Sequence, residues 1–161
     1  TLGVSTFVPK AHTPFQWQGV RPEADKRLKR LATRLKPKGV ELRPESYGWS
    51  VIQALLSRRD RRLAPVIAAV RGSQESLGGW KKAYRAAREE ELPAASSAGV
   101  PLPRPPAWEE VVHEAWSDDQ LLPWCHLDGP LASDPLLKHQ RQALSPENAP
   151  VTPSDTPPDS V

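Results

Sequence analysis

The stretch Phe7-Val8-Pro9-Lys10-Ala11-His12-Thr13-Pro14-Phe15-Gln16-Trp17 decides how this chain is interpreted. It continues a short apolar run, and residues 2–8 together predict a short buried strand. Pro9 and Pro14 end that strand and force an extended loop through Trp17. A strand needs other strands to pair with, and this one comes almost at the first residue. The 161 residues also contain no Met, so the sequence shows no initiator methionine. We therefore expect this stretch to be the late part of a larger protein whose N-terminal part is missing.

The composition predicts a modest folded core. Hydrophobic residues make up 38% of the chain, with 19 Pro, two Phe and two Tyr, against about 45–50% apolar residues in globular domains. The single cysteine, Cys125, excludes an internal disulfide and any multi-cysteine zinc or iron–sulfur site made by this chain alone. There is no secretory segment and no apolar stretch near the ~18 residues of a membrane span. We therefore expect a cytoplasmic protein with no membrane partner.

The charge is distributed unevenly along the chain. Residues 21–91 carry 18 Lys and Arg against 9 Asp and Glu, which gives a net charge of +9, whereas residues 92–161 carry a net charge of −7. A basic middle region of this kind could meet nucleic acid, an acidic cofactor, or the acidic C-terminal part of the same chain.

Hydrophobic periodicity predicts helices in the first half of the chain. Residues 23–36 carry apolar side chains at the spacing of one helix face, after Pro22 and before Pro37 and Gly39. Residues 40–43 are a possible short strand. Ser46 or Ser50 could cap a helix carrying Val51 to Leu56, and Pro65 predicts a break around residues 60–64 before a helix that ends near residue 71. A further helix is expected over residues 80–91.

The second half is predicted to be less regular. Residues 93–106 form a small-residue, Pro-rich linker. Residues 108–116 predict a short helix, residues 117–133 an irregular loop, and Asp134 a cap for a helix that ends at Leu144. Residues 145–161 contain several Pro and no aromatic residue, and are predicted to be a disordered tail.

Four motifs in the same order resemble one group of proteins. Phe7–Trp17 is similar to the segment after the last barrel strand of radical SAM proteins that carry an N-terminal cobalamin-binding-like domain. Ser57–Arg62 resembles their Ala-Arg-Gly-Asp-Arg-Arg motif, Leu77–Trp80 a Phe-Asp-x-Trp element, and Leu122–Gly129 a Leu-Pro-Trp-Asp-His-Ile-Asp-x-Gly element. The chain departs from the pattern in three places, with Arg59 in place of Gly, Gly78 in place of Asp, and Cys125 in place of an acidic residue.

The resemblance implies a mostly α fold with one or two β-strands. We expect the terminal strand and helix of an incomplete TIM-like barrel, followed by a small helical C-terminal region and the disordered tail. The expected segments are the end of the barrel over 1–43, a helical region over 44–92, the linker over 93–106, a helical extension over 107–144, and the tail over 145–161.

The resemblance also implies cofactors that this chain cannot hold alone. Radical SAM proteins bind a 4Fe-4S cluster through Cys-x-x-x-Cys-x-x-Cys and reduce S-adenosylmethionine to a 5′-deoxyadenosyl radical. With one cysteine, this chain supplies neither a metal site nor catalytic residues, and its expected partner is the missing N-terminal part of the same protein. Whether that parent also uses cobalamin is left open.

Four polar residues are candidates for lining the cofactor or substrate mouth. Active sites of barrels lie at the C-terminal ends of the strands, and Lys10, His12, Thr13 and Gln16 come just after the predicted strand. The alternative interpretation is that the prolines and aromatic residues lock a rigid loop, in which these polar groups satisfy the backbone.

The run Arg58–Arg62 also has two interpretations. It could bind a phosphate or a nucleic-acid backbone, but an ion-paired junction is favoured, in which Asp60 bridges two arginines and caps the next helix. The six tryptophans are expected to anchor small helices to a body with little other core.

The resulting hypothesis is a C-terminal portion of a radical SAM protein that closes the barrel and covers its mouth. The alternative hypothesis is a basic helical module that binds nucleic acid or a partner protein. A degraded remnant without a function is a third interpretation, which the two missing carboxylates at residues 78 and 125 would also fit.

Overall fold

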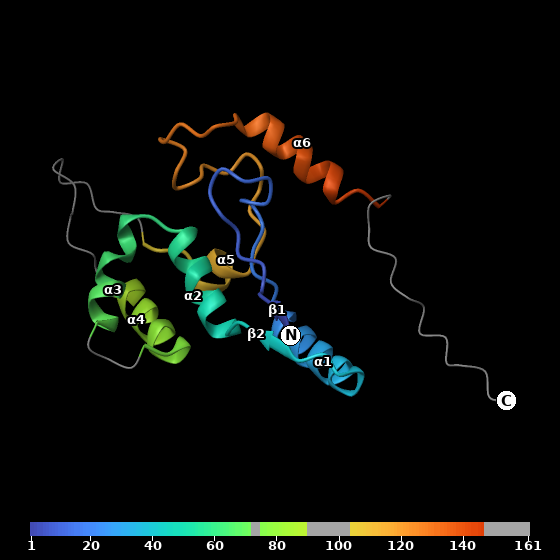
Figure 1. The fold of residues 1–161 in the computed structure, drawn as a ribbon. Coiled ribbons are helices and arrows are strands. Elements are labelled where there is room, and N and C mark those ends of the chain that lie inside the picture. The colour runs from blue at the N-terminus through green and yellow to red at the C-terminus, as the bar shows by residue number, and fades with distance from the viewer. Residues whose placement is uncertain (72–74, 90–103, 147–161) are drawn as a thin grey trace, which may run out of the picture.

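A computed structural model describes residues 1–71, 75–89 and 104–146 (Figure 1). This part is mostly helical, as the sequence predicts, and its one sheet has two strands. The predicted linker and tail lie largely outside the described residues. In chain order the elements are β1 (Leu2–Val4), α1 (Ala24–Leu35), the 3-10 helix η1 (Lys36–Lys38), β2 (Leu42–Pro44), α2 (Tyr47–Ser57), the 3-10 helix η2 (Arg61–Leu63), α3 (Ala64–Val70), α4 (Leu77–Glu89), α5 (Trp108–Val112) and α6 (Ser133–Ala143).

β1 and β2 form a short parallel pair, in which Leu2 faces Leu42 and Val4 faces Pro44. The prediction of a buried strand over residues 2–8 is wrong in extent and in environment. β1 ends at Val4, opposite Pro44, which has no N–H to donate to a longer ladder. Leu2 is 46% exposed because the described residues do not cover that part of the pair.

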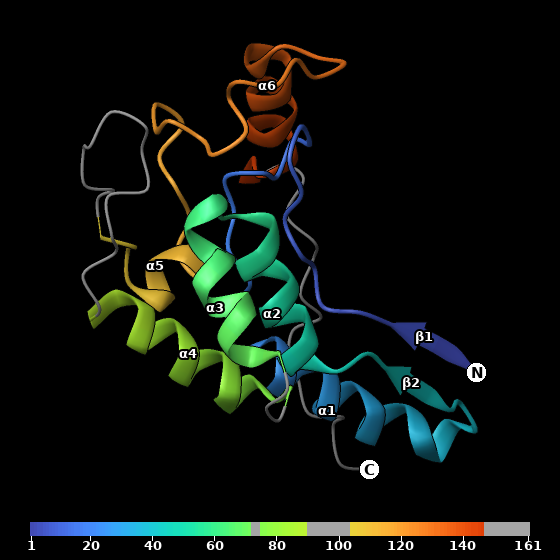
Figure 2. The ribbon, with the colours of Figure 1, turned by 90° about the vertical axis from the view of Figure 1, so that its left-hand side faces the viewer.

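Helix α1 connects the two strands and projects with them from the helical body (Figure 2). The predicted helix over 23–36 is confirmed to within one residue at each end. The chain leaves it through η1 and Gly39, whose φ of 71° is a left-handed conformation that glycine adopts without strain. None of the residues of α1 is buried, and Leu31 is 37% exposed. The apolar face of this helix is therefore only partly covered.

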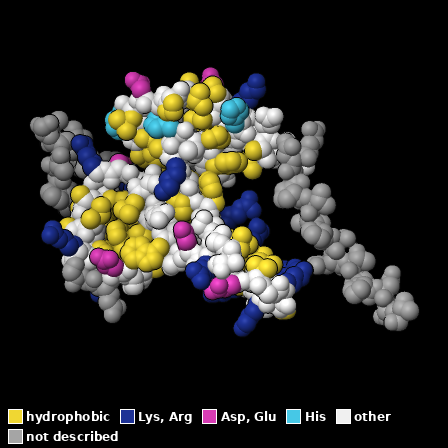
Figure 3. All heavy atoms as spheres, viewed as in Figure 1, with side chains coloured by type: hydrophobic (Ala, Val, Ile, Leu, Met, Phe, Trp, Pro, Cys, Tyr) yellow, Lys and Arg dark blue, Asp and Glu magenta, His cyan; other side chains and the backbone are white. Residues whose placement is uncertain are grey.

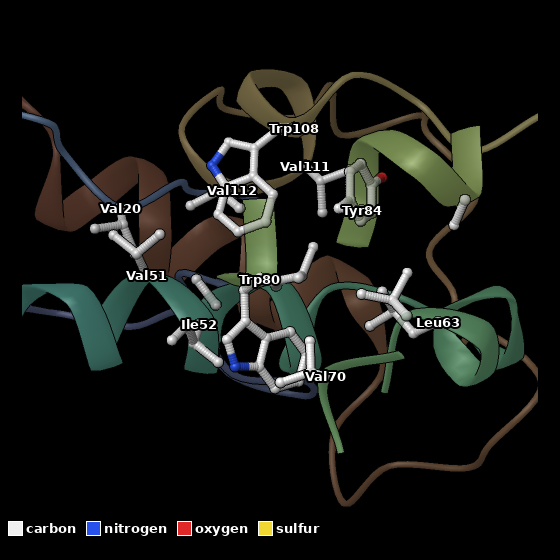
Figure 4. Packing of buried hydrophobic residues seen from close by; sticks show 14 residues of the cluster. Val20, Val51, Ile52, Leu63, Val70, Trp80, Tyr84, Trp108, Val111 and Val112 are labelled. Atoms are coloured by element: carbon white, nitrogen blue, oxygen red, sulfur yellow. The ribbon is translucent and has the colours of Figure 1, made fainter. Parts of the chain in front are cut away.

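The main core lies among α2, α3, α4 and α5 (Figure 4). Ser46 caps α2, since its Oγ accepts a hydrogen bond from Trp49 N at 3.5 Å, so the first of the two predicted caps is correct. Trp80 from α4 and Trp108 from α5 are buried in this core, and the Tyr84 ring meets Trp108 edge to face at 5.6 Å between centroids. Trp80 and Trp108 thus anchor short helices as expected, whereas Trp49 is 47% exposed, and Trp17, Trp116 and Trp124 lie in loops.

The break predicted around residues 60–64 is confirmed. Helix α2 ends at Ser57, and Asp60 caps η2 by accepting a hydrogen bond from Arg62 N at 2.9 Å. Pro65 lies in the first turn of α3, where its missing N–H leaves no helical hydrogen bond unmade. The short 3-10 turn therefore lets the chain reverse direction between α2 and α3.

A second apolar cluster holds the C-terminal part of the described chain. It contains Trp17, Leu122, Trp124 and Leu136, so it joins the Phe7–Trp17 loop to the loop before α6 and to α6 itself. Asp134 is not the cap of α6, because the N-cap is Ala132. Asp134 lies in the first turn, where its charge favours the positive end of the helix dipole.

The surface keeps several hydrophobic side chains, as Figure 3 shows over the α3 and α4 side of the body and over the part that carries α6. Ile67 on α3 and Leu56 on α2 are 48% and 43% exposed. The short helices therefore cover one another incompletely. In the described part of the chain, none of the helices has the length and apolar character needed to cross a bilayer.

Candidate functional site

The Phe7–Trp17 loop is held in shape by its own contacts. The rings of Phe7 and Phe15 meet edge to face at 5.8 Å between centroids, and the Thr13 hydroxyl donates to Lys10 O at 2.7 Å. His12 has a φ of 56°, a left-handed conformation that costs a residue with a Cβ about 1–2 kcal/mol. The side chain of His12 lies directly against Gly129. The loop is therefore fixed partly by the segment that packs on it.

Gln16 joins this loop to the Leu122–Gly129 motif. Its side chain is buried, and its Oε1 accepts hydrogen bonds from His12 N at 2.9 Å and from Trp124 Nε1 at 2.8 Å. One amide oxygen thus fixes the left-handed turn of the loop and the position of a tryptophan far along the sequence. This arrangement brings the first and the fourth motif into direct contact.

The residues after the loop pair with the end of α5. Trp116 N donates to Trp17 O at 2.7 Å, and Val20 N donates to Val112 O at 2.8 Å. Gly19 lies between these two bonds, where a Cβ would run into the backbone of His113. The predicted helix over 108–116 is accordingly too long, and α5 ends at Val112. In a longer helix Trp116 N would donate to Val112 O, but here these two groups bond to Trp17 O and Val20 N.

Arg58 brings the second motif to the same place. Its side chain is fully buried, and Nη1 donates to Val111 O at 2.6 Å and to Glu114 O at 3.0 Å. The guanidinium carbon also lies 3.8 Å from the centroid of a Trp116 ring. Burial lowers the pKa of Arg58 to about 10, so the group remains charged at neutral pH. Arg58 therefore satisfies one carbonyl group in the last turn of α5 and one just after it, which have no further helical turn to bind them.

A neighbouring contact ties the end of α2 to the loop. The Ser57 hydroxyl donates to Pro9 O at 3.0 Å, and Pro9 is itself buried. The first, second and fourth motifs thus meet at one site. The third motif, Leu77–Trp80, instead forms the start of α4, and its Trp80 side chain is buried in the main core.

Arg59 and Arg62 lie near the Asp60 carboxylate, whereas Arg58 bonds to backbone carbonyl groups. Asp60 forms an ion pair with Arg62 at 2.6 Å, whereas the nearest Arg59 nitrogen is 4.0 Å from Asp60. Burial by itself raises the pKa of Asp60, but the hydrogen bonds from the Arg62 side chain and backbone, with the charges of both arginines, outweigh it and hold the pKa at about 2. The predicted ion-paired cap is therefore confirmed for Arg62.

A pocket of about 820 Å³ lies beside this run. One side is formed by Arg59–Arg62 and the other by Pro123, Trp124, His126 and Leu127. The pocket volume is within the ~300–1,000 Å³ range of small-molecule sites. Its walls come from the second and fourth motifs, which the sequence separates widely.

The four predicted mouth-lining residues do not share one environment. His12 and Gln16 line a different pocket, of about 440 Å³, together with residues of the 118–136 segment. Lys10 and Thr13 are not among the residues that line it, and Thr13 instead bonds to Lys10 O. Cys125 lines the same pocket as an exposed free thiol. Among the described residues, no three His, Cys, Asp or Glu side chains gather as they would around a metal ion.

Sequence reasoning missed the inward role of Arg58. A signal was present, because Arg58 follows Val51, Ala54 and Leu55 by seven, four and three residues, the spacing of one helix face. Those three residues are buried and so is Arg58. The chain passes Arg59 without a positive φ, so the arginine at the position of the family's glycine imposes no left-handed strain there.

Comparison of the chain with protein-family models, with curated proteins and with solved structures finds no match. The resemblance to radical SAM proteins therefore depends on the four sequence motifs alone.

Proposed function

We propose that this chain is the C-terminal portion of a radical SAM protein, in which it closes the edge of the barrel and covers the cofactor and substrate mouth. The observation that carries the proposal is the meeting of Phe7–Trp17, Ser57–Arg62 and Leu122–Gly129 at one site. We take these three segments, which lie far apart in the sequence, as parts of one functional surface.

The β1–β2 pair supports this proposal independently. Parallel sheets occur almost only where both faces are covered, yet this parallel pair has two strands and Leu2 is 46% exposed. Helix α1 shields it only in part, because no residue of α1 is buried. Further barrel strands beside the pair would give these apolar groups the cover that the described residues lack.

The coding sequence immediately upstream in the same frame tests the proposal. We expect it to encode Cys-x-x-x-Cys-x-x-Cys, since three thiolates of that spacing hold the cluster and leave one iron open for S-adenosylmethionine. The longer protein, purified without oxygen and supplied with iron and sulfide, should then bind a 4Fe-4S cluster. A start codon at the position of Thr1 preceded by an in-frame stop would refute the proposal.

One observation favours a second candidate, a basic helical module that binds nucleic acid. The ion pairs found within the described part of the chain each lie inside the basic middle region or inside the acidic C-terminal part, such as Lys29 with Asp25 and Arg141 with Asp118. None of these pairs neutralises the basic middle region with the acidic C-terminal part, and Arg27, Arg30 and Arg34 of α1 remain exposed. Binding to single-stranded RNA measured over a range of salt tests this candidate. Absence of binding at low salt would exclude it, since contacts to phosphates depend steeply on salt.

A further inference from the structure

The pocket beside α2 and η2 has one strongly basic wall and one largely apolar wall. Arg59, Arg61 and Arg62 contribute three positive charges and Asp60 one negative charge, so this wall carries a net charge of +2. The opposite wall is formed by residues 123–127, with Pro123, Trp124 and Leu127 facing the pocket. Such a combination suits a ligand that has an anionic end and an uncharged body.

Arg59 is the most unusual group of this wall. Its side chain is only 4% exposed, and its Nε and Nη2 have no hydrogen-bond partner among the described residues. A buried cation without good partners is costly, because it has lost its hydration and gained little in exchange. Burial accordingly lowers the pKa of Arg59, and the charge of Arg62 acts in the same direction.

Asp60 neutralises Arg59 only in part. Its Oδ1 accepts hydrogen bonds from Arg62 N and Arg62 Nε, both at 2.9 Å, and its Oδ2 accepts one from Arg62 Nη2 at 2.6 Å. The Asp60 carboxylate is thus fully used by Arg62, and it lies 4.0 Å from the nearest Arg59 nitrogen. The wall therefore keeps its surplus of positive charge.

We propose that this pocket binds the phosphate group of a small phosphomonoester, with Arg59 as its main ligand. A phosphate dianion matches the net charge of the wall, and its oxygens can accept two hydrogen bonds from one guanidinium. The Nε and Nη2 donors of Arg59 have no hydrogen-bond partner among the described residues, so binding breaks no hydrogen bond of these atoms. Both atoms are covered, so the side chain must shift to present them to a phosphate in the pocket.

The size of the pocket indicates more than a free ion. A volume of about 820 Å³ is several times larger than a phosphate needs, and the apolar side chains opposite the arginines provide a surface for an organic group. Pro123 and Leu127 are placed to contact that group. The ligand class is therefore a phosphate ester with an uncharged, partly apolar body.

The proposal does not depend on the radical SAM hypothesis. Arg59 stands where the resembling proteins have glycine, so the unpaired guanidinium is a feature of this chain. The two proposals can fail separately, because one is tested by the upstream coding sequence and the other by binding to the chain itself.

Thermal unfolding of the chain in inorganic phosphate, in phenyl phosphate and in sodium chloride of equal ionic strength tests the pocket. A ligand that binds only the folded state raises the midpoint in a saturable way. We expect saturable stabilisation by both phosphates, stronger with phenyl phosphate, and none with chloride. An equal effect of chloride would overturn the proposal, since general screening would then explain the stabilisation.

Arg59→Met identifies the group responsible. Methionine keeps an apolar side chain in the buried position while it removes the charge, and replacing an unpaired buried ion in this way is often neutral or stabilising. We expect phosphate to bind this variant at least about tenfold more weakly, as measured by calorimetry. The matched control is Arg85→Met, which removes an exposed arginine of α4 outside the pocket and should bind like the native chain. Equal weakening in the two variants would overturn the proposal.

A measurement on the native chain covers the case in which Arg59→Met does not fold. The Nε–H of Arg59 is buried and should give a slowly exchanging NMR signal that shifts as phosphate is added. A titration in which no arginine Nε–H signal moves would overturn the proposal.

Binding of RNA provides the last comparison. If RNA binds more tightly than phenyl phosphate, and if Arg59→Met and Arg85→Met weaken that binding equally, the chain has a general basic surface and the proposed pocket is overturned.

Discussion

The indole Nε1 of Trp124 donates a 2.8 Å hydrogen bond to Oε1 of Gln16, a partner 108 residues earlier in the chain. Both side chains are buried, and the same oxygen also accepts from His12 N. This bond therefore links the loop that opens the chain to the loop that precedes α6.

Removal of the indole donor should loosen that link. Trp124→Phe keeps most of the apolar contact but leaves Gln16 with one partner fewer, so we expect the free energy of unfolding to fall by about 1–2 kcal/mol. Urea unfolding measures the change. Trp49→Phe is the control, because Trp49 is 47% exposed and its replacement should change the free energy by less than about 0.5 kcal/mol. Equal effects of the two substitutions would contradict this role of the Gln16 bond.

Gly19 should tolerate no side chain. A Cβ there would collide with the backbone of His113 and lie 2.9 Å from Glu114 O, and backbone cannot move aside as a side-chain end can. We expect Gly19→Ala to lower the free energy of unfolding by about 1–3 kcal/mol or to prevent folding. Gly78→Ala is the matched control, because Gly78 has space around it in the first turn of α4 and should gain helix propensity. A Gly19→Ala chain as stable as the native one would show that residues 17–20 do not pack on the end of α5 in this way.

Local pattern predicted the helices well where neighbours in sequence decide the structure. Helix α1 follows from periodicity and was predictable, and the sequence narrowed the cap of α2 to Ser46 or Ser50, of which the structure has Ser46. The end of α5 was not predictable, because it is fixed by Trp17 and Val20 from a distant loop. The helix spacing of Arg58 after Val51, Ala54 and Leu55 indicated that it lies inward, but its partners, Val111 O and Glu114 O, were not predictable because they come from a distant segment.

Arg58 should be replaceable by neither lysine nor methionine. Lysine keeps the charge but has no planar fork with which to reach Val111 O and Glu114 O together. Methionine leaves those buried carbonyl groups without their donor. We expect each substitution to lower the free energy of unfolding by about 2–4 kcal/mol. Arg85→Lys on the exposed side of α4 serves as the control, and native stability of Arg58→Lys would contradict a specific guanidinium role.

Asp60 should make the stability of the chain depend on acid. Its pKa of about 2 in the folded chain lies below the ordinary value of 3.8. The carboxylate therefore stabilises the fold at every pH above the ordinary value, by roughly 1–2 kcal/mol, and this contribution is lost as the pH falls through about 2. Asp60→Asn retains a good capping side chain but cannot carry the charge. The difference in unfolding free energy between native and variant should hence be largest at pH 5 and shrink steadily towards pH 2, as measured by urea unfolding at each pH. A difference that stays constant over this range would mean that Asp60 acts through its shape and hydrogen bonds alone, without its charge.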